Sequence, residues 1–206
     1  MLTVGLTGSI AVGKSHVCRV LSEAGLHVLD ADQTAREVVA AGTDGLAEIV
    51  RNFGKEVLQS DGELDRKKLG AIIFGDPEKR QLLNSIVHPR VISAQNDWIE
   101  KLEKSDPKGI AVVDAALIIE SGGYKRFDQI IVVWCDPAIQ LKRLMLRDGL
   151  DESEARQRIA SQMPQEEKTR YADHLIETSH GFEATERQTL DLIEKLKHQA
   201  AMRDEN

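Results

Sequence analysis

The N-terminal region contains residues whose types and spacing suit phosphate binding. They read Gly8-Ser9-Ile10-Ala11-Val12-Gly13-Lys14-Ser15, the pattern of a Walker A loop. The glycines let the backbone wrap closely around phosphates, while successive N–H groups point inward and form an anion nest. A helix expected from about Lys14 presents its positive N-terminal end to the same anion. We therefore expect Lys14 to reach the β- and γ-phosphates of a nucleotide and the Ser15 hydroxyl to ligate Mg²⁺.

The loop and the start of the following helix are the predicted nucleotide site. The residues assigned to ATP binding here are Gly8, Ala11, Val12, Gly13, Lys14, Ser15 and His16. A dinucleotide fingerprint fits worse, because two non-glycine residues follow Gly8 before the next glycine is reached. A glycine-rich turn without a ligand is the other alternative. The buried strand expected before the loop and the amphipathic helix expected after it favour the phosphate loop.

Three carboxylates follow predicted strands. Asp30 and Asp32 come at the end of the second apolar run, and Asp114 closes a later one. Ligands of open parallel sheets bind beyond the carboxyl ends of the strands, where a carboxylate can accept a proton from an attacking hydroxyl. We assign Asp32 as that base and give Asp30 a structural or metal-facing role, the alternative being a helix N-cap. Asp114 suits a Walker B carboxylate for Mg²⁺, and a strand-end cap is its alternative.

Two arginines stand one helical turn apart. Arg143 and Arg147 have i,i+4 spacing and share a helix face. Such arginines can clamp a transferring phosphoryl group and neutralise its charge. We assign Arg143 to catalysis and Arg147 to nucleotide binding. The alternative is a solvated basic face, since Lys142 lies in the same helix.

Five apolar runs are expected to form the strands that position these residues. Rich in Val and Ile and without alternation, they suit strands buried on both faces of a parallel sheet. Helical patterns between them indicate repeated βαβ units, the first being a helix over residues 16–24. The predicted fold is α/β: a doubly wound, five-stranded parallel sheet of P-loop kinase type, with a helical acceptor-binding insertion and a lid. The predicted strands cover residues 2–6, 26–29, 109–113, 129–134 and 174–176.

We expect residues 1–206 to form a single domain. Its core covers about 1–32, 109–136 and 173–198, the acceptor-binding insertion about 33–108, and the lid about 137–172. The alternative is that both long stretches are ordinary solvated helices. The last residues, about 199–206, are expected to fray.

The composition of the chain argues against binding to nucleic acid or to a membrane. A net charge of −7 argues against a broad basic face for nucleic acid, and Trp98 and Trp134 are too few for a stacking platform. No window approaches the ~18–20 apolar residues of a membrane span, and no signal peptide is recognisable. Cys18 and Cys135 indicate reduced thiols, Cys18 as a small core residue. We expect a cytoplasmic protein that binds neither nucleic acid nor membrane.

These residues alone predict a small-molecule kinase. One rival is a P-loop kinase for a nucleoside monophosphate or another metabolite. A second rival, of a different class, is a nucleotide-dependent switch such as a GTPase. Such switches usually read guanine with an Asn-Lys-x-Asp-type element, which this sequence lacks.

Over nearly its whole length the chain resembles the dephospho-coenzyme A kinase family. No single short motif beyond the phosphate loop is decisive, but their order and spacing together are specific. They are Gly5-Leu6-Thr7-Gly8, Asp30-Ala31-Asp32 with Ala35-Arg36, Leu64-Asp65-Arg66, Leu83-Asn84-Ser85-Ile86-Val87-His88-Pro89, residues 114–120, Gln140-Leu141 with Arg143 and Arg147, Gln162, and Ala172-Asp173.

The resemblance implies that ATP phosphorylates the ribose 3′-hydroxyl of dephospho-coenzyme A, the final step of coenzyme A synthesis. We expect a monomer or a weak homo-oligomer. The resemblance implies that Arg66 meets substrate phosphate, with a surface salt bridge as the alternative. It also implies that His88 lines the acceptor pocket. Because Pro89 biases the preceding residue away from helix, a helix-boundary or structural histidine is the alternative.

The sequence departs from the family pattern at several positions. Ser9, Ala11 and Val12 replace a Gly, a Gly and a Ser of the loop, and Ala11 restricts a backbone angle that Gly would permit. A Pro-Leu-Leu-Phe-Glu pattern appears as Ala-Leu-Ile-Ile-Glu at 116–120, and Thr178 stands where Asn is common. Lys14, Ser15, Asp32 and both arginines are intact, so we expect an active enzyme.

Overall fold

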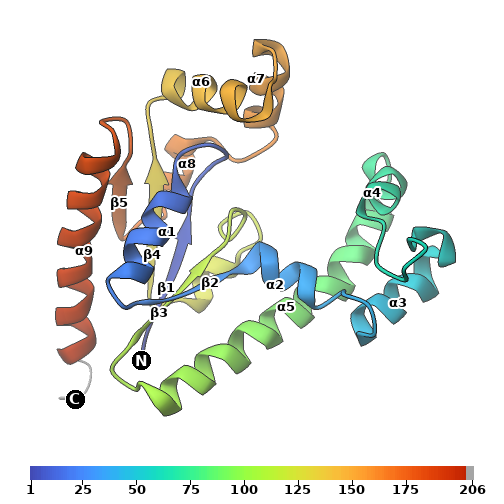
Figure 1. The fold of residues 1–206 in the computed structure, drawn as a ribbon, viewed down its shortest axis with the longest axis horizontal. Helices are drawn as coiled ribbons and strands as arrows, with labels where there is room; N and C mark the ends of the chain where they lie inside the picture. The colour runs from blue at the N-terminus through green and yellow to red at the C-terminus, as the bar shows by residue number, and fades with distance from the viewer. Residues whose placement is uncertain (203–206) are drawn as a thin grey trace. The chain divides into compact units, whose positions relative to one another are not determined.

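Five short strands form a parallel sheet in the computed structural model, which describes residues 1–202 (Figure 1). Each strand agrees with its predicted apolar run to within one residue at either end, and the predicted five-stranded parallel α/β fold is confirmed. The strand order is β2-β3-β1-β4-β5, so β1 is central. The strands are β1 (Leu2–Thr7), β2 (His27–Asp30), β3 (Ile110–Asp114), β4 (Gln129–Trp134) and β5 (His174–Glu177).

The register of the sheet aligns the carboxyl ends of its strands. Leu6 of β1 and Asp30 of β2 are both opposite Asp114 of β3. On the other side of β1, Thr7 is opposite Val132 of β4. From β1 the chain runs to the edge strand β2, returns to β3 and then crosses to β4. The connections of the sheet thus run to one side of β1 first and to its other side later. The loop after β1 leaves the sheet at this reversal of strand order, where such sheets usually bind ligands.

Helices α1 (Lys14–Glu23) and α9 (Phe182–Met202) pack against each other beside the sheet (Figure 1). The apolar face predicted for the first helix is buried, with Val17, Val20 and Leu21 in the core. The fraying expected from residue 199 is wrong for residues 199–202, which continue α9, and residues 203–206 lie outside the described residues. After β4 come α6 (Pro137–Asp148), α7 (Glu152–Ala160) and α8 (Gln165–Thr169), and a 3-10 turn, η2 (Gly123–Arg126), precedes β4.

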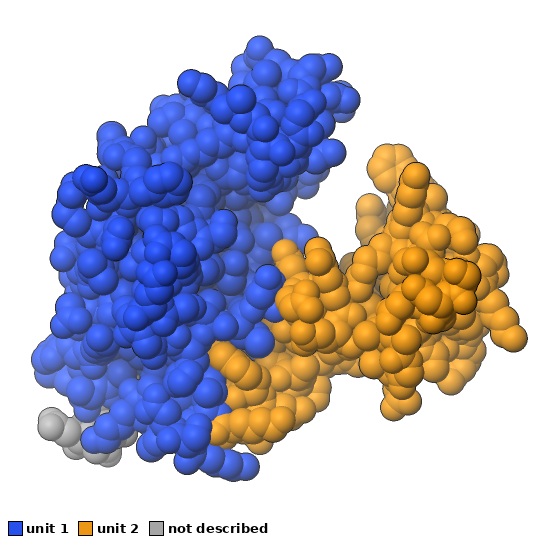
Figure 2. Space-filling view, viewed as in Figure 1, with its two compact units in different colours: residues 1–30, 102–206 blue, residues 31–101 orange. Residues whose placement is uncertain are grey.

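The chain divides into two compact units, coloured separately in Figure 2. The first comprises residues 1–30 and the chain from 102 onward, and the second comprises residues 31–101. The second unit has its own apolar core, which includes Ile49, Val57, Leu69 and Ile86. Within residues 1–202, no helix has the length and apolar composition to cross a membrane. The helices that begin in the second unit are α2 (Ala31–Glu37), α3 (Asp44–Phe53), η1 (Lys55–Val57), α4 (Arg66–Phe74) and α5 (Pro77–Ser105).

Helix α5 overturns one expectation from the sequence. It runs without interruption through Pro89, so His88 lies inside a helix rather than at a boundary. Pro89 has no N–H for the carbonyl of Ser85, but both residues are on the exposed face, where water can serve that carbonyl. On the opposite face Ile86 is buried in the core of the second unit. This packing outweighs the local preference of the residue before proline.

A Pro89→Ala variant should be more stable than the parent by about 1–3 kcal/mol, because an alanine N–H can restore the bond to the Ser85 carbonyl. Urea unfolding followed by far-UV circular dichroism measures the change. Equal or lower stability would show that the proline ring contributes packing that exceeds the lost hydrogen bond.

Candidate active site

The loop between β1 and α1 has the backbone shape expected of a phosphate loop. Gly13, the N-cap of α1, has φ 97° and ψ 18°, in the left-handed region. A Cβ at Gly8 would overlap the carbonyl oxygen of Val133 and the side chain of Val12. Ala11 also takes a left-handed angle, with φ 59°, which costs an L-residue about 1–2 kcal/mol. Ala11 thus adopts the backbone angle that its Cβ disfavours, and the contacts of the neighbouring residues Ile10 and Val12 must offset this cost.

Thr178 supplies one of these contacts from the end of β5. Its hydroxyl donates to the carbonyl of Val12 over 2.6 Å and accepts from Nη1 of Arg143 over 2.8 Å. Nη2 of Arg143 donates to the Thr178 carbonyl over 2.7 Å. The Val12 side chain is fully buried in the core of the first unit, so its predicted nucleotide contact can involve only its backbone. In the sequence Thr178 is only a departure from the family pattern, with no predicted role.

Two glutamines hold the loop at Ile10. The Ile10 N–H donates to Oε1 of Gln162 over 2.8 Å, and Nε2 of Gln140 donates to the Ile10 carbonyl over 2.8 Å. Both glutamines appeared in the sequence only as parts of a resemblance. Their spacing from the loop, 152 and 130 residues, left no local signal of the contact.

Lys14 and Asp114 form an ion pair beside the loop. Nζ of Lys14 lies 2.9 Å from Oδ1 of Asp114, and the Cys18 thiol donates to Oδ2 over 3.4 Å. Burial raises the pKa of the Cys18 thiol, and the charge of Asp114 and this hydrogen bond raise it further. Cys18 borders the core as predicted and is also a protonated donor to Asp114. The carboxylate of Asp114 therefore faces the loop rather than acting as a simple strand cap.

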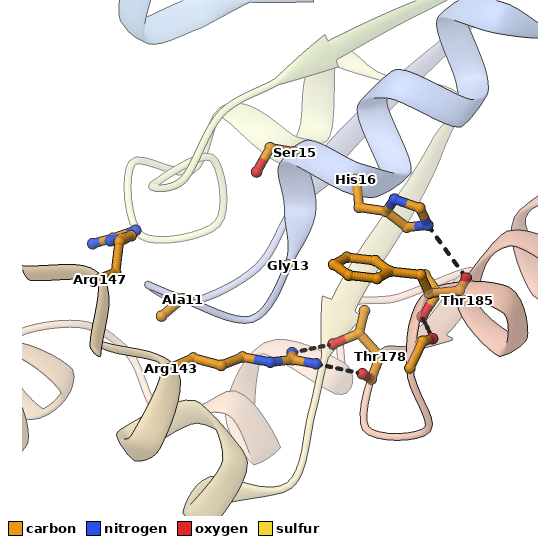
Figure 3. Close-up of a pocket in the computed structure, with 10 residues that line it drawn as sticks. Ala11, Gly13, Ser15, His16, Arg143, Arg147, Thr178 and Thr185 are labelled. Atoms are coloured by element: carbon orange, nitrogen blue, oxygen red, sulfur yellow. Dashed lines mark hydrogen bonds between the residues drawn. The ribbon is translucent and has the colours of Figure 1, made fainter. Parts of the chain in front are cut away.

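A cavity of about 350 Å³ adjoins the loop (Figure 3). Its walls come from the loop and α1, from the arginines of α6, and from the segment joining β5 to α9. The His16 ring lies 4.8 Å from the Phe182 ring, giving the cavity an aromatic wall. Aromatic and cationic surfaces next to an anion nest suit a nucleotide base with its phosphates. The lining residues are Ala11, Gly13, Ser15, His16, Arg143, Arg147, Thr178, Gly181, Phe182 and Thr185.

The two arginines of α6 differ in their partners. Arg143 reaches from its helix to Thr178, as Figure 3 shows. Arg147 instead pairs with Asp148, with Nε 2.7 Å from Oδ1, and Arg158 binds the same carboxylate over 2.8 Å. The hydrogen bond from Arg147 is the main reason that the pKa of Asp148 is lowered. Both arginines line the cavity, and their roles as phosphoryl clamp and nucleotide contact stay predictions.

The predicted acceptor residues lie in the second unit. Asp32 is the second residue of α2, so the N-cap alternative is wrong for it and remains only for Asp30. Arg66 is the first residue of α4, and its Nη2 donates to the carbonyl of Arg36 over 3.4 Å. Arg36 shares a face of α2 with Asp32 at i,i+4 spacing. His88 is exposed on α5 and lies inside that helix, so the helix-boundary alternative is wrong for it.

Ser15 and Asp114 provide oxygen ligands of the kind that Mg²⁺ prefers. The Ser15 side chain lines the cavity, and Asp114 is 18% exposed beside the loop. Magnesium usually takes one or two protein ligands and completes its shell with water and substrate phosphates. Within residues 1–202, no group of three or more His, Cys, Asp or Glu side chains is arranged to hold a metal ion. The donor set fits an ion that shares its ligands with a nucleotide.

Replacing Thr178 with Val should lower the free energy of unfolding by about 1–3 kcal/mol, because the Val12 carbonyl loses its donor inside the protein. The matched Thr178→Ser variant keeps the hydroxyl and loses only a methyl group, at a cost of about 1 kcal/mol or less. Urea unfolding of both variants measures the difference. If the two variants are equally stable, the hydroxyl does not support the loop.

The family model and the relatives that match this chain all carry the description dephospho-CoA kinase. A family model described as Dephospho-CoA kinase matches residues 2–183. A dephospho-CoA kinase of Listeria innocua is 48% identical over 193 residues, which cover 94% of this chain and 96% of the relative. A dephospho-CoA kinase domain-containing protein of Danio rerio is 49% identical over 199 residues, covering 95% of this chain and 86% of the relative.

Solved structures similar to this chain include a dephospho-CoA kinase and other proteins of the same fold. A Thermus thermophilus protein superposes with a TM-score of 0.80 at 30% identity, over 95% of this chain and 97% of that one. A dephospho-CoA kinase from Campylobacter jejuni superposes with a TM-score of 0.65 at 25% identity, over 94% and 96%. A shikimate kinase from Acinetobacter baumannii shares the fold alone, at 16% identity and a TM-score of 0.54. The match of the family model to residues 2–183, together with these relatives, shows that the chain belongs to the dephospho-CoA kinase family.

Proposed function

We propose that the protein transfers the γ-phosphoryl group of ATP to the ribose 3′-hydroxyl of dephospho-coenzyme A, the final step of coenzyme A synthesis. The observation that carries the proposal is the phosphate loop with its adjoining cavity, found in a chain of this family. A cytoplasmic monomer or weak homo-oligomer stays our expectation. The lid over residues 137–172 and the acceptor-binding role of the insertion are parts of the same proposal.

The first unit would hold the nucleotide. The N–H groups of the loop and the N-terminal end of α1 bind phosphate oxygens, and the base occupies the cavity beside Phe182. Lys14 lies next to the loop and carries its charge to the β- and γ-phosphates. Arg143, anchored on Thr178, neutralises charge as the phosphoryl group moves. Ser15 and Asp114 would hold Mg²⁺, which when bound neutralises phosphate oxygens.

The second unit would contribute the acceptor's contacts. Asp32 takes the proton from the 3′-hydroxyl as that oxygen attacks the γ-phosphorus. Chain connectivity alone keeps the Cα of Asp32 within about 7 Å of the Cα of Asp30, which ends β2 at the carboxyl edge of the sheet. Arg36 shares its helix face, and Arg66 donates to the Arg36 carbonyl, so two guanidinium groups belong to this region. They suit the phosphates of the acceptor. His88 stays a predicted acceptor contact.

A steady-state assay of ADP release tests the proposal. Purified protein with ATP and Mg²⁺ should turn over dephospho-coenzyme A and give a product phosphorylated at the 3′ position, identified by phosphorus NMR. A panel of nucleoside monophosphates and shikimate serves as the control and should give kcat/KM at least about 10²-fold lower, the scale for losing matched polar contacts. A preference for any panel member over dephospho-coenzyme A would reject the proposal.

Asp32→Asn tests the base. Asn keeps the shape of the side chain but cannot accept the proton, so kcat should fall by about 10²–10⁴-fold. ATP affinity and thermal stability should change little. Asp97→Asn, on the exposed face of α5, makes the same change of charge and should leave kcat near that of the parent. A kcat for Asp32→Asn within a few-fold of the parent would leave phosphate positioning, without a general base, as the source of catalysis.

A further inference from the structure

Gln140 and Gln162 bind the two backbone polar groups of Ile10 in the phosphate loop. Nε2 of Gln140 donates to the Ile10 carbonyl over 2.8 Å, and Oε1 of Gln162 accepts from the Ile10 N–H over 2.8 Å. Gln140 is 2% exposed, so its amide is removed from water. Neither glutamine lines the cavity. Their effect on a nucleotide would therefore have to pass through the loop.

The hydrogen bonds continue beyond Gln140. Nε2 of Gln165 donates to Oε1 of Gln140 over 2.7 Å, and Oε1 of Gln165 accepts from the N–H of Cys135 over 3.0 Å. Cys135 follows β4 directly, so the chain of amides joins the sheet to the loop. Its direction is fixed at both ends by backbone groups. A backbone N–H can only donate at Cys135, and a backbone carbonyl can only accept at Ile10. Each amide in such a chain polarises the next.

The residue held in this way precedes the strained part of the loop. Ala11 follows Ile10 and has φ 59°, a conformation that alanine disfavours. On the other side of Ala11, the Val12 carbonyl is bound by Thr178 over 2.6 Å. The carbonyl groups of Ile10 and Val12, the residues on either side of Ala11, are thus both bound by side chains from distant parts of the chain. These contacts oppose relaxation of the loop to a shape in which its N–H groups would no longer converge on an anion.

We propose that Gln140 and Gln162 are positioning residues for phosphate binding: by binding the N–H and the carbonyl of Ile10 they hold the strained loop in its anion-binding shape. The two residues do so with opposite polarity. Gln140 must donate, and Gln162 must accept. The proposal rests on the proposed function in that the anion is the phosphate chain of ATP.

The opposite polarity gives a matched pair of variants. Gln162→Glu keeps an oxygen that accepts from the Ile10 N–H. Gln140→Glu removes the donor and sets a carboxylate against the Ile10 carbonyl, while the bond from Gln165 is still possible. Both variants add one negative charge next to the backbone of Ile10, so repulsion of ATP by that charge affects both. The difference between them isolates the donor at Gln140.

The dissociation constant of ATP with Mg²⁺, measured by calorimetry on the full chain, is the first measurement. Gln140→Glu should weaken ATP binding at least about 10-fold more than Gln162→Glu does, the scale of one buried hydrogen bond to a group left unpaired. The difference should narrow as the pH is lowered, because a protonated carboxyl can again donate to the Ile10 carbonyl. The KM for dephospho-coenzyme A should stay near that of the parent in both variants.

Equal ATP affinities of the two variants would overturn the proposal. So would a Gln140→Glu variant that melts at a lower temperature but binds ATP as Gln162→Glu does, since that pattern shows a purely structural role. If Gln140→Glu does not fold, Gln165→Glu replaces it. This variant still accepts from Cys135 but no longer donates to Gln140, and it should weaken ATP binding in the same direction. Parent-like binding by Gln165→Glu would then overturn the proposal.

The measurement separates this proposal from the proposed function. ATP binding requires no acceptor. The ratio of the ATP dissociation constants of Gln140→Glu and Gln162→Glu therefore tests the role of the glutamines even if the parent fails to phosphorylate dephospho-coenzyme A. Conversely, a parent that turns over dephospho-coenzyme A with unaltered ATP binding in all three variants would keep the function and remove the glutamines from it.

Discussion

The parallel pairing of β1 with β3 sets the position of the charged groups around the phosphate loop. Leu6, near the end of β1, lies opposite Asp114, and Asp30 lies opposite the same residue from β2. This register brings two carboxylates to the edge of the sheet at which the loop begins. Lys14, in the first turn of α1, then reaches Asp114 over 2.9 Å. A shift of one residue in this pairing would turn Asp114 to the other face of the sheet.

At this edge of the sheet Lys14 and Asp114 form an ion pair, and the Cys18 thiol lies beside it. Lys14 and Asp114 are 19% and 18% exposed, so each is largely withdrawn from water and depends on the other. The Cys18 thiol, its pKa raised by burial and by Asp114, adds a neutral donor to the same carboxylate. An incoming phosphate therefore competes with Asp114 for Lys14. Asp114 holds the ammonium group of Lys14 beside the loop, and a phosphate that binds in the loop can replace Asp114 as the partner of this ammonium group.

Local patterns in the sequence predicted the strands, the loop and the buried face of α1, because burial of Val and Ile and the spacing of glycines act over a few residues. They failed at His88, where core packing of Ile86 carried α5 through Pro89. They also gave no role to Gln140, Gln162 or Thr178. These three side chains contact the loop across 130, 152 and 166 residues, and such contacts depend on the completed fold. The relation of Asp32 to a hydroxyl stays a prediction for the same reason.

Thr178 is also the last residue to arrive among those that support the loop. During synthesis the ribosome releases β1 and the phosphate loop first, but β4, Gln140, Gln162 and finally Thr178 appear only after most of the chain is made. A nascent chain shorter than this lacks one or more of the side chains that bind the backbone of Ile10 and of Val12, on either side of Ala11. ATP in the cell can stabilise only a conformation that binds it, so it cannot assist the folding of the early chain. We therefore expect nucleotide affinity to be acquired only near the end of translation, once Thr178 can reach the Val12 carbonyl.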